Sequence, residues 1–194
     1  TENSGILGGY TMAWTTPKTW VAGNTLTAAE LNEQVRDNLT FLNSKPSADY
    51  VLDEASDYTT TSGTFVDIDS TNLSLSITTG GGDVLAWFTA ICYPNTTNSP
   101  THANFDIDVD GSRIGGDDGL QIAIASGSGT YAYDQRGFFV VRLITGLSAG
   151  SHTFTAQWKV ASGWTMPAGA GTTSGPGGAT FSLDIHPQFG VREL

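Results

Sequence analysis

The spacing of apolar residues changes at residue 47, and this change most constrains the fold of the 194-residue chain. From there to the C-terminus, apolar residues recur at every second position, and turn residues follow about every eight to twelve residues. In HTFTAQWKV the residues predicted to face inward are Phe154, Ala156, Trp158 and Val160. Because successive side chains of a strand point to opposite faces, the pattern predicts an all-β, antiparallel sandwich or barrel over residues 47–194.

Two central segments, DVLAWFTAICY and FFVVRLI, are instead apolar on both faces. The outer faces of an isolated two-layer sandwich are expected to contact water, so these strands need cover on their second face. Another copy of the chain is the simplest cover, which predicts a homo-oligomer packed through sheet faces. The candidate interface residues are Trp87, Tyr93, Phe139 and Val141. The alternative interpretation is that Trp87 and Tyr93 are ordinary scattered exposed residues.

One segment before residue 47, TLTAAELNEQVRDNLTFLN, predicts an α-helix over residues 28–43. Thr27 and Glu30 have the spacing of a capping box, and Pro46 stops the helix. The apolar positions at helical spacing are Leu31, Val35, Leu39 and Leu42. A helix of this length is marginal in water, so its apolar stripe has to pack on the main domain, on sister helices or on another protein.

The stretch AWTTPKTWVAG before the helix is predicted to be an extended aromatic arm, too short to have its own core. We interpret residues 12–46 as an attachment segment and residues 1–11 as an expression remnant or an upstream extension. The predicted attachment residues are Trp14, Trp20, Leu31, Val35, Leu39 and Leu42.

Charge and composition exclude several classes of function. Nineteen acidic and eight basic residues give a net charge of −11, which repels nucleic acid and acidic membrane surfaces. The longest apolar run, around residues 84–93, is too short to span a bilayer, so we expect neither nucleic-acid binding nor membrane insertion. With one cysteine, the chain has no internal disulfide framework. A charged fraction of only 14% favours an exposed structural protein over a metabolic enzyme.

The stretch NFDIDVDGSRIGGDD partly matches a calcium-binding loop. Asp106, Asp108, Asp110, Gly111 and Asp117 have the required spacing, but aspartate replaces the final glutamate. Apolar residues alternate with the acids, and Asp110-Gly111 is a strong hairpin-turn signal. We therefore predict a strand with Asp106 and Asp108 pointing to solvent. Incidental calcium binding by Asp106, Asp108 and Asp110 is the alternative, and no metal or other cofactor is expected.

We identify no catalytic site in the sequence. The chain has no phosphate-binding GxxxxGK, and the histidines have no adjacent nucleophile signal, so we expect a protein that is not an enzyme. His152 starts a strand, where turn hydrogen bonding is the favoured role. Three loop aromatics, Tyr131, Tyr133 and Trp164, are candidate contacts to a glycan or protein receptor. The alternative is that each ring anchors its own loop.

Two stretches carry a resemblance to a known family. TTPKTWVAGNTLTAAELNEQVRDNLTFL resembles the opening of many tailed-bacteriophage structural proteins, and DVDGSRIGG…RLITGLSAGSHTFTAQWKV…HPQFGVREL resembles the jelly-roll domain that often follows it. These jelly rolls are similar to the trimeric tumour-necrosis-factor and complement globular-head folds. The resemblance implies a jelly-roll β-sandwich preceded by an arm and one helix, and it carries over no catalytic residue.

The same resemblance implies a function in the virion. The expected protein is a homotrimer, made in the host cytoplasm, that binds other virion proteins through its N-terminal segment. It would serve as a capsid decoration or as a fibre component that contacts a host-surface glycan or protein. The absence of shaft repeats favours the decoration or short-spike role. A stand-alone carbohydrate-binding module is the alternative, but it gives the helix and the arm no role.

Overall fold

The computed structural model describes residues 15–43, 45–51, 57–94, 101–125, 136–161, 163–166, 170–174, 180–184 and 186–194. The chain divides into two compact units, Thr1–Pro46 and Ser47–Leu194. We describe each unit by itself. No helix among the described residues is both long enough and apolar enough to cross a membrane.

The first unit contains one continuous helical segment with the predicted limits. It comprises α1 (Ala28–Leu31), a π-helical stretch η1 (Asn32–Asp37) and α2 (Asn38–Asn43). The predicted capping box is present, because the Glu30 N–H donates to Thr27 Oγ1 and the Thr27 N–H donates to the Glu30 carboxylate. These bonds satisfy backbone donors that a helix start otherwise leaves unpaired.

In the second unit, the first sheet is built around one long strand, β5. Its order is β1-β14-β5-β11-β2, and β9 pairs with the other edge of β5. The strands are β1 (Ser47–Val51), β14 (Gln188–Glu193), β5 (Gly82–Pro94), β9 (Arg136–Leu147), β11 (Trp164–Met166) and β2 (Tyr58–Thr60).

The second sheet is built around β10. Strands β3 and β4 pair with one edge of β10, β6 pairs with the other edge, and β7 and β8 pair with β6. The strands are β10 (Gly150–Val160), β3 (Val66–Asp67), β4 (Ser74–Thr79), β6 (Thr101–Val109), β7 (Ser112–Arg113) and β8 (Gln121–Ala125). The strands β12 (Ala170–Ser174) and β13 (Thr180–Asp184) pair with each other in a separate two-stranded sheet.

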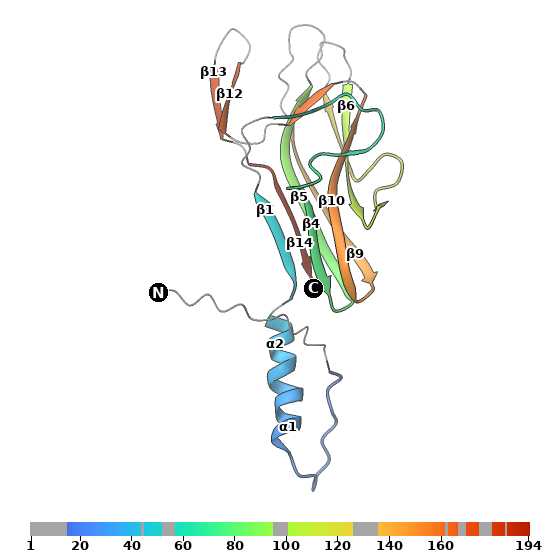
Figure 1. The fold of residues 1–194 in the computed structure, drawn as a ribbon, viewed down its shortest axis with the longest axis vertical. Helices are drawn as coiled ribbons and strands as arrows, with labels where there is room; N and C mark the ends of the chain where they lie inside the picture. Colours follow the sequence, from blue (N-terminus) through green and yellow to red (C-terminus); the bar gives the residue numbers. More distant parts are fainter. Residues whose placement is uncertain are drawn as a thin grey trace. The chain divides into compact units, whose positions relative to one another are not determined.

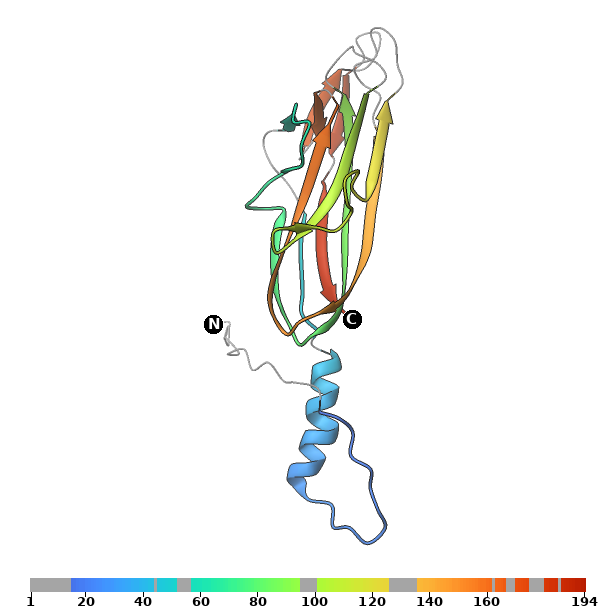
Figure 2. The same ribbon diagram turned by 90° about the vertical axis from the view of Figure 1, so that its right-hand side faces the viewer.

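The strand order is that of a jelly roll. The eight principal strands form one sheet in the order β1-β14-β5-β9 and another in the order β4-β10-β6-β8. All pairings are antiparallel. The two sheets pack face to face (Figures 1 and 2). The prediction of an all-β, antiparallel sandwich preceded by a helix is therefore confirmed.

Aromatic side chains from both sheets form the core between them. Phe105 of β6 stacks on Phe138 of β9, with ring centroids 3.7 Å apart. Phe88 packs edge-on against Phe138 and Phe189, at 5.2 and 6.0 Å. The four residues of β10 predicted to face inward are all buried. Alternation in the sequence thus identified the core face of this strand correctly.

Candidate functional site

The outer side of the first sheet carries a cluster of apolar side chains, which we name the apolar face. It consists of Leu85, Trp87 and Ile91 of β5 together with Phe139, Val141 and Leu143 of β9. The register pairs Leu85 with Leu143 and Trp87 with Val141, so the two rows lie side by side. The three β9 residues are exposed, Phe139 by 58%, and the three β5 residues are half-buried.

Trp87 shapes the apolar face by lying against the neighbouring strand. A Cβ placed on Gly190 of β14 would be 2.1 Å from Trp87 Cζ2, so only glycine leaves room for the indole ring. Tyr93, the remaining predicted interface residue, is half-buried on β5, where its backbone pairs with Thr165 of β11. The structure thus brings Trp87, Phe139 and Val141 together on one outer face.

In the first unit, polar side chains on one side of the helix hold the arm. Glu30, Gln34 and Asn38 follow one another at four-residue spacing and therefore share a side of the helix. Glu30 forms an ion pair with Lys18, and Gln34 Oε1 accepts the Lys18 N–H at 2.7 Å. The Asn38 side chain binds both the N–H and the carbonyl of Thr15, each at 3.0 Å. The arm is therefore attached through polar contacts.

The apolar stripe of the same helix is exposed in this unit. Its members are the predicted residues Leu31, Val35, Leu39 and Leu42, all at least 47% exposed. Trp20 of the arm is also exposed, with Lys18 Nζ 5.1 Å from the centroid of its ring. Trp14 lies outside the described residues.

The acidic residues of β6 point away from the core, as their alternation predicts, but the prediction that they contact solvent is wrong. Asp106 is fully buried and Asp108 is 8% exposed. The reason is that residues 111–120 fold back over β6. Arg113 Nη1 lies 3.3 Å from Asp106 Oδ2, and the Leu120 N–H donates to the Phe105 carbonyl at 2.8 Å.

Asp106 is the anchor of this covering segment. Its carboxylate accepts the Ile107 N–H at 2.8 Å and also bonds to the backbone N–H of Gly115. Burial raises the pKa of Asp106, while the hydrogen bond from Ile107 and the charge of Arg113 act in the opposite direction. A buried carboxylate with these partners fixes a loop rather than serving a ligand.

The three acids considered for calcium do not converge on one point. Asp106 binds Arg113, Asp108 accepts the Gly111 N–H, and Asp110 turns toward β10. Asp110 is in the left-handed region with φ of 53°, as its predicted turn requires. No group of three His, Cys, Asp or Glu side chains in the described part of the chain is arranged to hold a metal ion.

His152 fixes this turn to β10, in agreement with the predicted hydrogen-bonding role. Its Nδ1 lies 2.7 Å from Asp110 Oδ2, and its Nε2 lies 2.9 Å from the Ser148 carbonyl. Because both ring nitrogens face acceptors, the protonated ring satisfies both contacts. The hydrogen bond to Asp110, followed by the bond to Ser148, raises the pKa of His152.

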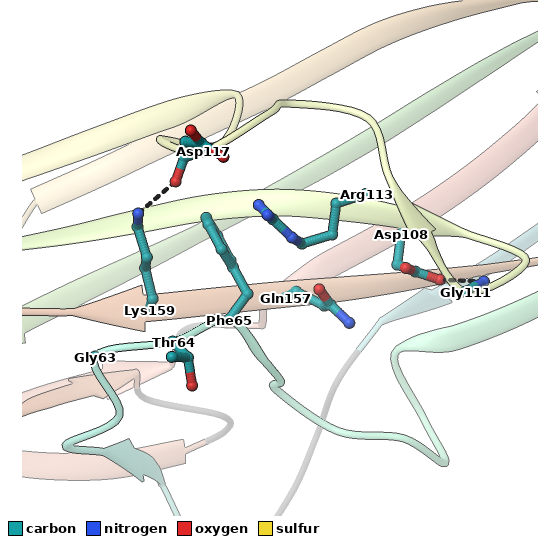
Figure 3. Close-up of a pocket in the computed structure, with 9 residues that line it drawn as sticks. All are labelled: Gly63, Thr64, Phe65, Asp108, Gly111, Arg113, Asp117, Gln157 and Lys159. Carbon is teal, nitrogen blue, oxygen red and sulfur yellow. Dashed lines mark hydrogen bonds between the residues drawn. The ribbon is translucent and has the colours of Figure 1, made fainter.

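A cleft of about 450 Å³, which we name the outer cleft, lies on the outer side of β6 and β10 (Figure 3). Its lining comes from the segment before β3, from β6, from the covering segment and from β10. The lining residues are Gly63, Thr64, Phe65, Asp108, Gly111, Arg113, Asp117, Gln157 and Lys159. No local sequence pattern predicts this cleft, because its lining residues are brought together only by long-range folding.

Phe65 organises the cationic side chains of the outer cleft. The guanidinium carbon of Arg113 lies 4.3 Å from the centroid of the Phe65 ring, and Lys159 Nζ lies 5.0 Å from it. Lys159 also donates to the Asp117 carbonyl. Figure 3 shows the ring between the two cationic side chains. These cation–π contacts and the hydrogen bond hold both charges beside the Phe65 ring.

The loop aromatics are not gathered into a surface among the described residues. Trp164 is one of the candidate receptor contacts, with anchoring of its own loop as the alternative, and its full burial agrees with the alternative. It belongs to β11, which pairs with β2 and β5, and its Nε1–H donates to Thr101 Oγ1 at 3.1 Å. The ring therefore anchors its own segment. Tyr131 and Tyr133 lie outside the described residues.

No protein-family model matches the chain. No curated protein matches it either. Among solved structures, the chain is similar to dimeric latent PorU from Porphyromonas gingivalis, with 11% sequence identity and a TM-score of 0.33 over 77% of this chain. The chain corresponds to 13% of the length of that protein. A likeness this weak carries no argument, so the function has to be inferred from the residues themselves.

Proposed function

We propose that this chain is a non-enzymatic structural protein of a tailed-bacteriophage particle, a homotrimer that attaches to the particle through residues 12–46. In this role it serves as a capsid decoration or as a fibre component that contacts the host. The observation that carries the proposal is the exposed apolar face of β5 and β9. The sequence resemblance to phage structural proteins supports the assignment to a phage particle and the choice of three copies per assembly.

The energetics favour self-association through the apolar face. Fully burying one exposed large apolar side chain contributes about 1.5–3 kcal/mol, and each copy presents three exposed and three half-buried side chains of this kind on the face. Association costs about 4–15 kcal/mol in lost freedom of motion, so several of these side chains have to be covered at once. Rotational symmetry meets that requirement, because every copy then contributes the same face.

The helix supports the attachment part of the proposal. Its polar side already holds the arm through Glu30, Gln34 and Asn38, whereas the leucine and valine stripe is exposed. An amphipathic helix gains most of its stability from packing its apolar side on a partner. We assign that partner to another protein of the particle.

Substitution on the apolar face tests self-association. Phe139→Glu places a carboxylate where the proposal requires desolvation, which costs several kcal/mol, and should convert the assembly to single chains. Thr78→Glu is the matched control, because Thr78 is an exposed residue of the opposite sheet. Native mass spectrometry measures both. An assembly that persists unchanged in Phe139→Glu would contradict the role of this face.

The particle role has its own test. Tailed-phage particles purified from the source of this sequence should contain the chain in stoichiometric amount by quantitative mass spectrometry. Leu39→Glu introduces a charge into the helical stripe and should reduce the amount bound to particles, whereas Thr78→Glu should not. Particles that lack the chain altogether would rule out the virion assignment.

A further inference from the structure

The outer cleft lies on the opposite side of the sandwich from the apolar face. The cleft lies on β6 and β10 of the second sheet, whereas the apolar face belongs to β5 and β9 of the first. Covering the apolar face by other copies therefore leaves this side of the sandwich uncovered by the same contact. Its volume of about 450 Å³ is within the range of roughly 300–1,000 Å³ that small-molecule sites occupy.

Two oxygen atoms of the cleft residues lack hydrogen-bond donors. Asp108 Oδ1 accepts the Gly111 N–H at 2.7 Å, and no other hydrogen bond joins this carboxylate to the described residues, although the residue is only 8% exposed. Gln157 Nε2 donates to Asp67 Oδ1 at 2.8 Å, and its buried Oε1 has no partner. Buried polar atoms are normally paired, so the Gln157 oxygen indicates a missing donor, while the second Asp108 oxygen is a further acceptor at the cleft.

The charges of the lining residues restrict the charge that the donor group of a ligand can carry. Two carboxylates, of Asp108 and Asp117, face two cations, of Arg113 and Lys159, so the lining is neutral in sum. A metal ion or an ammonium group would meet both cations close by. A phosphate would meet both carboxylates on a protein whose net charge is −11. A neutral donor avoids both repulsions.

Hydroxyl groups meet every requirement of the outer cleft. A hydroxyl donates one hydrogen bond and accepts others, so adjacent hydroxyls can donate to Asp108 and Gln157 and accept from Arg113. Figure 3 shows these three side chains around the same hollow. We infer that the outer cleft binds a neutral, hydroxyl-rich ligand, namely a sugar residue, with Asp108 and Gln157 as acceptors and Arg113 as donor. This inference stands whether or not the chain forms a trimer.

A titration of the full chain tests the inference. The probes are D-glucose, D-galactose, D-mannose and N-acetyl-D-glucosamine, each followed by amide chemical shifts in ¹⁵N-labelled protein. We expect at least one sugar to give saturable shifts at Gly111, Arg113 and Gln157. Linear oligomers of the binding sugar distinguish the source, because tighter binding of the oligomer identifies a polysaccharide and equal binding identifies a free monosaccharide. Both results support a sugar site.

Two variants locate the binding. Asp108→Asn keeps an oxygen for the Gly111 N–H but removes the charge, and should weaken sugar binding about tenfold or more. Gln157→Met removes the unpaired oxygen and should weaken binding while the thermal midpoint stays the same or rises. Asp49→Asn, on an exposed acid of β1, is the matched control and should bind as the unaltered chain does.

Three outcomes would overturn the inference. In the first, none of the sugars shifts the three amides at concentrations up to the hundred-millimolar range. In the second, sugar binding is unchanged in both Asp108→Asn and Gln157→Met, which places it elsewhere. In the third, inorganic phosphate or calcium chloride produces larger saturable shifts in the cleft than any sugar, which identifies an ionic site instead.

Discussion

The two outer sides of the sandwich differ in a way that the sequence alone does not resolve. On the first sheet, the outward residues of β5 and β9 are apolar and remain exposed or half-buried. On the second sheet, the outward residues of β6 are acidic and are buried beneath residues 111–120. An isolated sandwich is expected to expose its polar side and cover its apolar side. This reversed arrangement is the basis of our proposal that the apolar side contacts another molecule.

The largest effect is expected from removing the anchor of the covered side. Asp106→Ala leaves the guanidinium of Arg113 and two backbone N–H groups without their acceptor, which should lower the free energy of unfolding by about 2–3 kcal/mol. Chemical denaturation measures the change. Asp49→Ala, an exposed acid on the outer side of the first sheet, should change it by less than about 0.5 kcal/mol. Equal effects of the two substitutions would remove the distinction between the two sides.

A smaller effect is expected within the apolar side. Gly190→Ala forces its new methyl group into the ring of Trp87 and should cost about 1–3 kcal/mol through overpacking. In the background of Trp87→Ala the same substitution should cost much less, because the obstructing ring is gone. A thermodynamic cycle of the four proteins measures the coupling. Additive effects would show that the ring does not lie over Gly190.

The smallest effect concerns the hydrogen bond that holds the turn at Asp110 against β10. The hydrogen bond between His152 and Asp110 raises the pKa of His152 and lowers that of Asp110. The hydrogen bond therefore contributes fully to stability between about pH 3.8 and pH 6.5, the ordinary pKa values of Asp110 and His152 in the unfolded chain. It is lost as the pH rises through the folded pKa of His152, and also as the pH falls through that of Asp110.

The contribution of the His152–Asp110 hydrogen bond to the free energy of unfolding should be below about 1 kcal/mol, because the Asp110 side chain is 46% exposed and solvent screens the pair. Unfolding measured between pH 6 and 9 should show the decline, and His152→Asn should remove that part of the pH dependence. A slope that persists in His152→Asn would assign the titration to another group.

Local patterns in the sequence were sufficient for the fold class, whereas the jelly roll was implied only by the resemblance to phage structural proteins. The period-two spacing of Phe154, Ala156, Trp158 and Val160 identified the inward side of β10, and the capping box with Pro46 fixed the limits of the helix. Both signals depend on residues close in sequence, where the geometry of a strand or helix decides which side chains share a face. The apolar face was predicted for the same reason.

Long-range contacts decided what the sequence could not show. Asp106 and Asp108 are buried because a segment beyond the hairpin turn folds back, and no local pattern encodes that cover. Trp164 sits in a glycine-rich stretch typical of a loop, yet pairing with β2 and β5 makes it a strand residue of the core. The outer cleft could not be predicted either, because its lining comes from both β10 and the segment before β3, which are far apart in the sequence.

The measurement that tests the central claim most directly is the mass of the intact chain in solution, by sedimentation equilibrium over a dilution series. Three copies of a 20.4 kDa chain, held together by the apolar face, should sediment as one species of three times that mass. The Phe139→Glu variant should sediment at 20.4 kDa. A single 20.4 kDa species for the unaltered chain at every concentration would contradict the account, because the exposed side of β5 and β9 would then need no partner.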